Sequence, residues 1–364
     1  MKKRAIFFFC ISLITLSMKS QHDIQELLPK ELDALNSALK EDTLFSKFVT
    51  RFGDPVQLYL DYKSKVRISD SIWSADQKNL KCLDNIGYTE HFEMLPLIDW
   101  FTKDESLIGE AGVSYLIRTD EATILFDVGL NSNNSDPSPL LNNMERLGVS
   151  LDEIDIIVIS HNHGDHVGGN QWTKIPTFSL TKNQIDLGQK IVYTPMPMDY
   201  PGLDPIYSRE PIKIAEGVST IGVIPCPMFF TDIGEQALAI NVKGKGIVII
   251  SGCGHQTIEK LILRSELLFN EEIYGLLGGF HLPVTESRNI DKIYQYFITD
   301  RLPWDPLTEK DIQNSIEFLI SHGIKITGVS GHDSCDDSID AFKNAYKNDY
   351  FDIVVGEKIT LNDQ

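Results

Sequence analysis

The chain has 364 residues, of which 42% are hydrophobic and 23% charged, and this ordinary globular usage excludes a fibrous or wholly disordered protein. Acidic residues outnumber Lys and Arg by 52 to 33, for a formal net charge of −19. A surface of that sign repels phosphate backbones unless basic residues cluster, and no stretch of the mature chain gathers them. We therefore expect no nucleic-acid partner and a small-molecule substrate.

The first twenty residues are typical of a secretory signal peptide. Basic residues at positions 2–4 precede an apolar run over 5–16, and a short polar stretch over 17–20 comes next. The apolar run is shorter than the roughly 20 residues that span a bilayer. We therefore predict cleavage near Ser20, a periplasmic or secreted protein, and no stable membrane span after processing. An uncleaved anchor is the alternative.

After the predicted signal peptide, the chain divides into an extension and a larger domain. Apolar residues recur at helical spacing over 23–42, which predicts an amphipathic helix. Between Phe45 and Phe92 the sequence is irregular and carries no chemical motif. The predicted organisation is a signal peptide over 1–20, an N-terminal extension over 21–92, and one domain over 93–364 against which the extension packs.

From Met94 onward, short β-rich runs alternate with helical segments. Strands are predicted at 95–100, 113–117, 122–126, 154–159, 237–242, 247–250, 273–277, 324–329 and 351–355, and helices at 140–147, 257–268 and 309–321. Two pairs of strands flank short turns and predict hairpins. This mixture predicts an α/β (α+β) protein, a four-layer αββα sandwich of two mixed sheets between helices, with an N-terminal helical extension.

Four potential metal ligands follow the apolar strand that leads to Ser160, namely His161, His163, Asp165 and His166. Imidazoles two residues apart in an extended loop point to the same side, while Asp165 and His166 on the next turn can face the same point from another direction. Three His and one Asp suit Zn²⁺ or a similar divalent ion, with room for two metals. Without a metal, four such groups at a strand end would carry an uncompensated desolvation cost.

Three further histidines repeat this pattern, each next to glycine at the end of a β-rich run: His255, His281 and His332. The glycines let the backbone approach a crowded site, and each strand end delivers one side chain. We therefore add these three to the candidate metal centre, with Glu235 and Asp333 as further pocket candidates. His22, His91 and His322 lack supporting spacing and are interpreted as surface or structural residues.

These motifs resemble the metallo-beta-lactamase superfamily. The run from Ile154 to Gly169 is similar to its His-x-His-x-Asp-His signature, and residues 123–129 resemble the preceding strand, which ends in a structural Asp. Residues 112–117, 235–238, 252–255, 278–282 and 355–359 resemble the branch labelled 7,8-dihydropterin-6-methyl-4-(β-D-ribofuranosyl)aminobenzene-5'-phosphate synthase, or dihydropteroate-synthase-like. The resemblance runs from Met94 to Thr360, with an insertion near 284–306.

The resemblance implies a four-layer metallo-beta-lactamase fold with two metal sites. The first metal would be held by His161, His163 and His255, and the second by Asp165, His166 and His332. Asp127 would orient the first cluster by hydrogen bonding without binding metal. Many members carry an Asp that bridges both metals after their third motif, whereas the next strand-end candidate here is His281. Because an imidazole does not bridge two metals as a carboxylate does, we expect the second site to be weaker.

The ligands favour hydrolysis, because a divalent metal with an open position lowers the pKa of bound water to about 7 and polarises a carbonyl or phosphoryl oxygen. We predict an exported metal-dependent hydrolase that acts on an ester, lactone, amide or phosphoester bond. The expected cofactors are two divalent ions, Zn²⁺ first, with Fe or Mn as alternatives. Asp165 would bind metal and also orient the attacking hydroxide. A nucleophilic Cys253 is disfavoured, because packing explains a strand-end thiol equally well.

Other functions stay open. The branch label implies a transferase that joins a pterin to an aminobenzoate derivative, although export would remove the chain from cytoplasmic pterin synthesis. A metal- or ligand-binding protein without turnover is a third class. An oxygen-reducing di-iron relative is disfavoured, because it would carry Glu where this chain has His163. The oligomeric state, and any disulfide among the cysteines at 82, 226, 253 and 335, do not follow from the sequence.

Overall fold

The computed structural model describes residues 29–361. The predicted signal peptide over 1–20 and the first part of the predicted 23–42 helix lie outside the described residues, and the rest of that helix is observed over 29–41. The chain divides into two compact units between Lys63 and Ser64. Within the described residues, no helix is both long enough and apolar enough to cross a membrane.

The first unit is helical. It contains the helix over 29–41, α2 (Thr43–Val49) and the start of α3 (Pro55–Asn79). Asp42 begins α2, because its carboxylate accepts hydrogen bonds from the backbone N–H groups of Leu44 at 3.1 Å and Phe45 at 3.0 Å. The expected N-terminal helical extension is therefore present.

The 25-residue helix α3 lies between Phe45 and Phe92, where the sequence analysis named no individual helix. Charged residues interrupt the apolar ones along this segment, so its sequence shows little helical periodicity. A local start signal is nevertheless present. Pro55 occupies the first turn, and the Asp54 carboxylate accepts a hydrogen bond from the backbone N–H of Gln57 at 2.9 Å.

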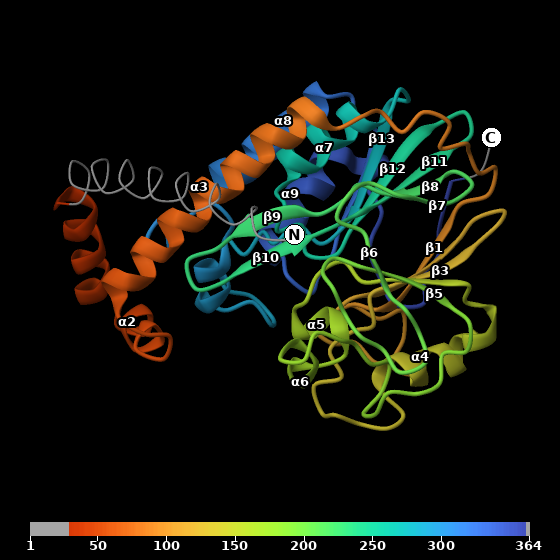
Figure 1. Ribbon diagram of the computed structural model, residues 1–364, viewed down its shortest axis with the longest axis horizontal. Coiled ribbons are helices and arrows are strands. Elements are labelled where there is room, and N and C mark those ends of the chain that lie inside the picture. Colours follow the sequence, from red (N-terminus) through yellow and green to blue (C-terminus); the bar gives the residue numbers. More distant parts are fainter. Residues whose placement is uncertain (1–28, 362–364) are drawn as a thin grey trace, which may run out of the picture. The chain divides into compact units, whose positions relative to one another are not determined.

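In the second unit, one sheet has seven strands in the order β15-β1-β2-β3-β4-β5-β6. Figure 1 labels β1, β3, β5 and β6 among them. Its strands are β1 (Glu93–Ile98), β2 (Ser114–Arg118), β3 (Thr123–Phe126), β4 (Ile156–Val158), β5 (Ile191–Thr194), β6 (Ile206–Tyr207) and β15 (Ile359–Thr360). The neighbours from β3 to β6 run parallel, and those from β15 to β3 run antiparallel. The carboxyl ends of β3 and β4 therefore meet at one edge.

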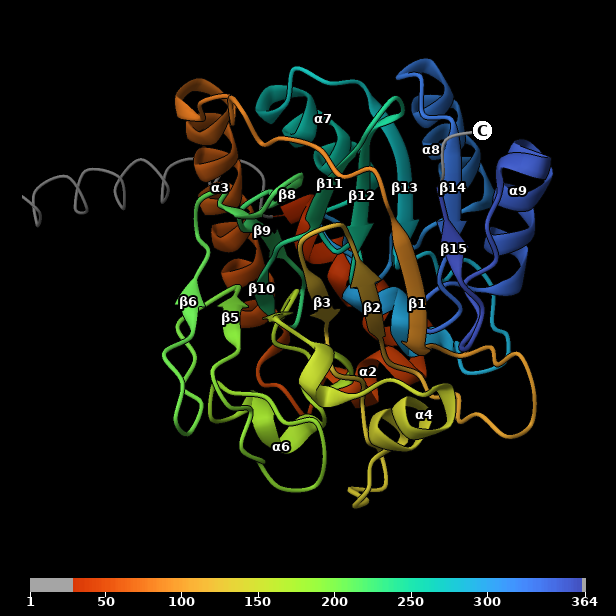
Figure 2. The ribbon, with the colours of Figure 1, turned by 90° about the vertical axis from the view of Figure 1, so that its right-hand side faces the viewer.

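A second sheet has six strands in the order β14-β13-β12-β11-β8-β7. Its strands are β7 (Lys213–Ala215), β8 (Val218–Thr220), β11 (Leu238–Val242), β12 (Gly246–Ser251), β13 (Ile273–Gly278) and β14 (Ile326–Val329), and a separate pair is formed by β9 (Ile224–Pro227) and β10 (Asp232–Glu235). Figure 2 shows β11, β12 and β13 side by side. Because β12, β13 and β14 run parallel, the loops after them also share one edge.

Three hydrophobic cores separate four layers of secondary structure. In β3, Ile124 and Phe126 pack against residues of the second sheet, while Leu125 between them faces the core that includes Met144 of α4. A third core joins the second sheet to α7, α8 and α9 (Figure 1). The longer helices here are α4 (Pro139–Leu147), α7 (Ile258–Leu268), α8 (Glu309–Ser321) and α9 (Asp336–Tyr346). This is the predicted αββα arrangement.

Short helices connect these elements. They are α5 (Gly164–Val167), α6 (Asn170–Thr173) and the 3₁₀ turns η1 (Leu151–Glu153), η2 (Lys292–Phe297) and η3 (Lys347–Asp349). The strand predicted over 351–355 was wrong, because this extended segment makes only isolated contacts, such as the bridge between Val355 and Thr102. The last strand is β15, which pairs with β1.

Candidate metal centre

The first group of predicted ligands follows β4 at the edge of the first sheet. The strand leads into Ser160 and His161, which are both fully buried. Helix α5 begins three residues later and carries Asp165 and His166. A loop at the carboxyl end of a parallel strand is a common position for binding sites in α/β proteins.

Three histidines of this centre face one another. The ring centroid of His161 lies 4.7 Å from that of His163 and 5.2 Å from that of His255, and the centroids of His163 and His255 are 5.0 Å apart. His255 comes from the loop after β12, in the second sheet. The structure thus brings together, from both sheets, the three residues expected to hold the first metal.

The residues expected at the second metal also lie together. Potential ligand atoms of Asp165, His166 and His332, together with that of Cys253, all lie within 4.8 Å of one another. The ring centroids of His166 and His332 are 5.4 Å apart, and His332 follows β14. Each predicted set therefore combines residues of the first and second sheets.

Hydrogen bonds assign the protonation of two imidazoles in the first cluster. Asp127 is fully buried and accepts hydrogen bonds from Ser160 Oγ at 2.6 Å and from His166 Nδ1 at 2.7 Å. Because the Ser160 hydroxyl proton goes to Asp127, His161 Nδ1 donates to Ser160 Oγ at 2.9 Å. Both rings therefore carry a proton on Nδ1, and Nε2 is the nitrogen left to bind a metal. Asp127 lies where the resemblance places an orienting residue.

His332, the last candidate ligand along the chain, is oriented in a similar way by a carboxylate that the sequence analysis missed. Asp99, immediately after β1, is fully buried and accepts hydrogen bonds from Ser330 Oγ at 2.5 Å and Tyr115 OH at 2.9 Å. His332 Nδ1 donates in turn to Ser330 Oγ at 2.6 Å, which leaves its Nε2 free. Its position at the end of a β-rich run was the available signal, whereas Asp127, at the end of another such run, was identified through the family resemblance.

Glu235, a pocket candidate from sequence, supports the loop after β12. Its side chain is fully buried, and its two oxygens accept hydrogen bonds from the backbone N–H groups of Cys253 at 2.9 Å, Gly254 at 3.0 Å and His255 at 2.7 Å. Burial raises the pKa of Glu235 to about 7. The carboxyl group thus fixes the backbone that presents both Cys253 and His255.

His281 faces the same centre. Its Nε2 donates to the carbonyl of Tyr294 at 3.2 Å, while its buried Nδ1 has no hydrogen-bond partner within the described residues. Its ring centroid lies 4.6 Å from that of His255, and Asp333 accepts a hydrogen bond from its backbone N–H at 2.9 Å. Gly279 permits this close approach, because a Cβ there would lie 2.1 Å from the carbonyl oxygen of Gly252.

Burial keeps most of these imidazoles neutral. It lowers the pKa of His161, His255 and His332 well below the ordinary value, and neighbouring histidines add to the effect at each of them. Burial also lowers the pKa of His281 to about 4. A neutral imidazole is the form that binds a metal, so four candidate ligands need not lose a proton first.

His166 behaves differently from the other histidines. Burial alone would lower its pKa, but the neighbouring Cys253 sulfur and the carboxylates of Asp165 and Asp127 raise it well above the ordinary value. Burial would raise the pKa of Asp165, whereas the positive charge and hydrogen bond of His166 lower it. The anionic groups around His166 thus attract a positive charge to this position.

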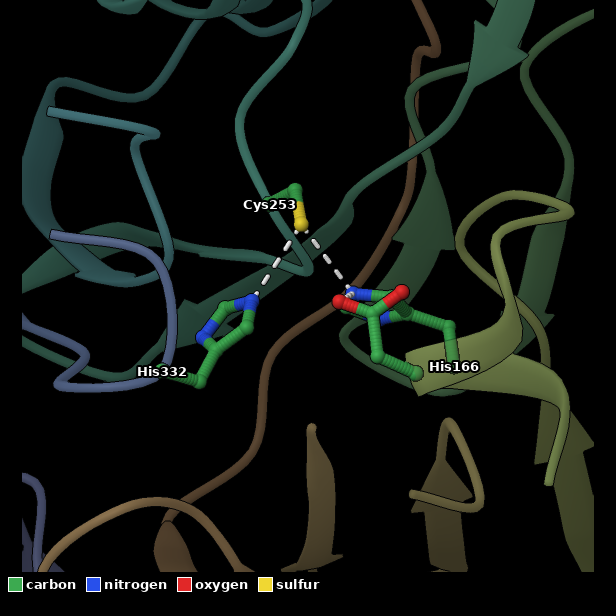
Figure 3. Close-up of side chains that lie close together, drawn as sticks. His166, Cys253 and His332 are labelled. Carbon is green, nitrogen blue, oxygen red and sulfur yellow. Dashed lines mark hydrogen bonds and ion pairs between the residues drawn. The ribbon is translucent and has the colours of Figure 1, made fainter. Parts of the chain in front are cut away.

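Cys253 occupies a more central place than sequence analysis expected for a packing thiol. Its Sγ lies 3.1 Å from His166 Nε2 and 3.2 Å from His332 Nε2, between the two rings (Figure 3). Cys82, Cys226 and Cys335 are also free thiols. The pair of glycines around Cys253 gave no sign that its sulfur would lie among the ligands.

The unpartnered nitrogens fit a divalent metal. Among the described residues, His161 Nε2 and both ring nitrogens of His255 are buried without a hydrogen-bond partner. A buried polar atom left in this state costs about 1–3 kcal/mol. Imidazole nitrogen together with carboxylate or thiolate is the ligand chemistry of zinc sites. A bound cation would therefore satisfy several donor atoms at once.

A cavity of 920 Å³ opens over the ligands. His163, Asp165, His255 and His281 contribute to its floor. Its other lining residues come from three regions: Ile72 from α3; Met196, Tyr207 and Arg209 from the 185–211 region; and Ile293, Tyr294 and Phe297 from the 284–306 insertion. A site of this size suits a small organic molecule.

The three histidines set aside in the sequence analysis lie elsewhere or outside the described part. His322 caps α8, where its Nδ1 pairs with Glu266 Oε1 at 2.7 Å. His91 is exposed in the loop before β1. His22 lies outside the described residues.

Comparison with known proteins agrees with this geometry. Residues 107–174, which include the His161–His166 cluster, match the family model of the metallo-beta-lactamase superfamily. The chain is thus similar to this superfamily over the segment that carries the first candidate ligands. It is 27% identical over 252 residues to the 7,8-dihydropterin-6-methyl-4-(beta-D-ribofuranosyl)-aminobenzene-5'-phosphate synthase of Methanocaldococcus jannaschii, covering 57% of this chain and 83% of the relative. An uncharacterized protein of the same organism is 26% identical, covering 54% and 82%.

Solved structures agree on the metallo-beta-lactamase fold. The crystal structure of a metal-dependent hydrolase of the beta-lactamase superfamily matches with a TM-score of 0.51 and 21% identity, covering 75% of this chain and all of the other. At this identity the similarity concerns the fold alone. The predicted fold is therefore confirmed, and the predicted resemblance to the superfamily is supported by the family model over residues 107–174.

Proposed function

We propose that this protein is an exported metal-dependent hydrolase of a small molecule with an ester, lactone, amide or phosphoester bond. The proposal rests mainly on one observation, which is that buried and unpartnered imidazole nitrogens lie at the floor of an open cavity. His161, His163 and His255 would hold one divalent ion, and Asp165, His166 and His332 a second. When bound, such ions lower the pKa of a water molecule and polarise the oxygen of the scissile bond.

The protein's own residues would orient the attacking water and bind the substrate. The Asp165 side chain is 28% exposed and lines the cavity, so its carboxylate can accept a hydrogen bond from a water molecule and orient it. Arg209 contributes a positive charge to the cavity wall, and Ile72 and Phe297 contribute apolar surface. These groups favour a substrate with both an apolar part and an anionic or strongly polar part.

The test is a substrate panel with protein reconstituted with Zn²⁺, Mn²⁺ or Fe²⁺. We expect turnover of a member among esters, lactones, phosphodiesters and β-lactams, and its loss in Asp165→Asn. His322→Ala is the matched control, since this imidazole pairs with Glu266 on the surface, and it should retain activity. An inert response across the panel with both metals bound would instead support a binding protein without turnover.

A second candidate function has its own support. The relative from Methanocaldococcus jannaschii is named as a synthase and shares 27% identity over 252 residues, so group transfer to a pterin is the alternative chemistry. Incubation with a pterin and an aminobenzoate derivative, followed by mass spectrometry of the products, separates the two. A joined product without hydrolysis of any panel member would favour the transferase.

A further inference from the structure

Cys253 is the one side chain common to all the candidate ligand groups found among the described residues. These groups are Asp165, His166, Cys253 and His332; His161, Cys253 and His255; and Cys253, His281 and Asp333. In each group the ligand atoms lie within 4.8 Å of one another. Figure 3 shows the sulfur between His166 and His332, which extend toward it from opposite sides. The sulfur therefore lies where the predicted ligand sets meet.

The backbone holds this sulfur in place. Glu235 accepts hydrogen bonds from three successive N–H groups, beginning with that of Cys253 itself. Gly254, the next residue, has φ +68, and a Cβ at that position would lie 2.6 Å from the carbonyl oxygen of Gly279. The Cys253 side chain is thus presented by a fixed loop and is only 3% exposed.

The neighbouring imidazoles supply an independent sign of a ligand. His161 Nε2 and both nitrogens of His255 are buried and unpartnered, and they belong to the same group as Cys253. On the other side, Nε2 of His332 is left unprotonated by the hydrogen bond from its Nδ1 to Ser330. A bound cation would satisfy these nitrogens. The Cys253 sulfur lies within 4.8 Å of candidate ligand atoms from both predicted metal sets.

We propose that Cys253 binds metal as a thiolate and bridges the two metal positions, in place of the carboxylate that this chain lacks after its third motif. On binding, the sulfur forms its metal bonds, and the thiol proton is released to solvent. Thiolate is a strong ligand for zinc, so this bridge would select zinc over manganese or magnesium. Like the proposed function, this inference requires metals at the centre. It does not depend on which reaction the protein catalyses.

Spectroscopy on the unmodified sequence tests the ligand directly. X-ray absorption of the zinc-loaded protein should show sulfur at about 2.3 Å from zinc besides nitrogen and oxygen. In a Co²⁺ titration, thiolate-to-cobalt charge-transfer absorption in the near ultraviolet should grow over both the first and the second equivalent. Growth over one equivalent only would overturn the bridge, and a fully loaded protein without sulfur at zinc would overturn the thiolate.

Variants provide the matched comparison. Cys253→Ser should lose the charge-transfer band and bind the second metal at least roughly 10-fold more weakly. Cys226→Ser should keep both, because Cys226 is also buried, but its sulfur donates to the carbonyl of Ile224 at 3.2 Å and belongs to none of the candidate ligand groups among the described residues. Full metal loading by nitrogen and oxygen alone would overturn this inference and leave the hydrolase proposal standing. Failure of the wild type to bind any metal would overturn both.

Discussion

His161 and His332 are oriented by the same chemical device, a serine hydroxyl that links the imidazole to a buried carboxylate. Ser160 links His161 to Asp127, and Ser330 links His332 to Asp99. In both cases the hydrogen bonds place the proton on Nδ1 and leave Nε2 for the metal. The orientation of the ligands thus depends on residues that need not contact a metal.

Ser330→Ala should weaken the second metal without unfolding the protein. The change removes the acceptor for His332 Nδ1, so the ring loses both its orientation and its fixed tautomer. We expect a roughly 10- to 100-fold loss in affinity for the second equivalent, measured by competition with a chelating dye. Ser219→Ala is the control, because the Ser219 hydroxyl is buried without a hydrogen-bond partner in the described structure. Equal affinities in the two variants would contradict the prediction.

His281→Ala distinguishes a ligand from a structural residue. Its Nδ1 is free and its Nε2 is held by the Tyr294 carbonyl, which is the usual arrangement of a metal-binding imidazole. We therefore expect second-metal affinity to fall roughly 10- to 100-fold with little change in melting temperature. His281→Asp should keep metal binding, since a carboxylate is also a ligand. A lower melting temperature with intact stoichiometry in both variants would remove His281 from the site.

At the scale of elements, Glu93 joins the first sheet to the end of the chain. It pairs with Arg118 across β1 and β2, and with Lys358 before β15 at 2.9 Å. Burial raises the pKa of Glu93, but the hydrogen bonds and charges of Lys358 and Arg118 lower it more. A lowered pKa means that the ionised form stabilises the fold above about pH 4.5, and that this contribution is lost as the pH falls.

Glu93→Gln should consequently destabilise the protein by about 2 kcal/mol at pH 7 and much less near pH 3. Urea denaturation at the two pH values measures this difference. Glu90→Gln serves as the control, because the Glu90 side chain is 62% exposed in its pair with Lys243 and should contribute less than about 0.5 kcal/mol. A loss of stability that stays the same at both pH values would rule out this electrostatic origin.

The elements that could be predicted from the sequence were those in which buried apolar residues recur in a regular pattern. Helix α8 was predicted with its observed bounds, and β12 and β13 to within a residue or two, because each has a buried apolar pattern. Helix α3 was missed because charged residues interrupt its apolar pattern, although Asp54 and Pro55 mark its start. In contrast, residues 351–355 look like a strand, yet their contacts are isolated bridges.

As with the helices and strands, part of the site could be predicted from the sequence pattern, and the rest depends on how distant segments pack together. All seven predicted ligands lie at one centre because each follows a recognisable strand and glycine pattern. The places of Asp99 and Ser330 depend on how β1 meets the loop after β14, two segments far apart in sequence. Cys253 was undervalued because a sequence does not reveal which way a side chain points between two glycines.

At the scale of the whole molecule, export remains a proposal that a mass measurement tests. The basic start and short apolar run predict removal of the first twenty or so residues. Intact mass of protein purified from its native compartment should therefore correspond to a chain beginning near Gln21. Retention of Met1 in that material would refute cleavage.

The candidate ligands come from both sheets, with His161, His163, Asp165 and His166 after β4 and His255, His281 and His332 after β12, β13 and β14. Bound metal would therefore link the two sheets of the sandwich and stabilise their association. A ligand at 100 times its dissociation constant adds about 2.7 kcal/mol to stability, and that contribution disappears when the ligand is scarce. For the exported protein that we propose, resistance to proteases would therefore follow the local supply of the metal.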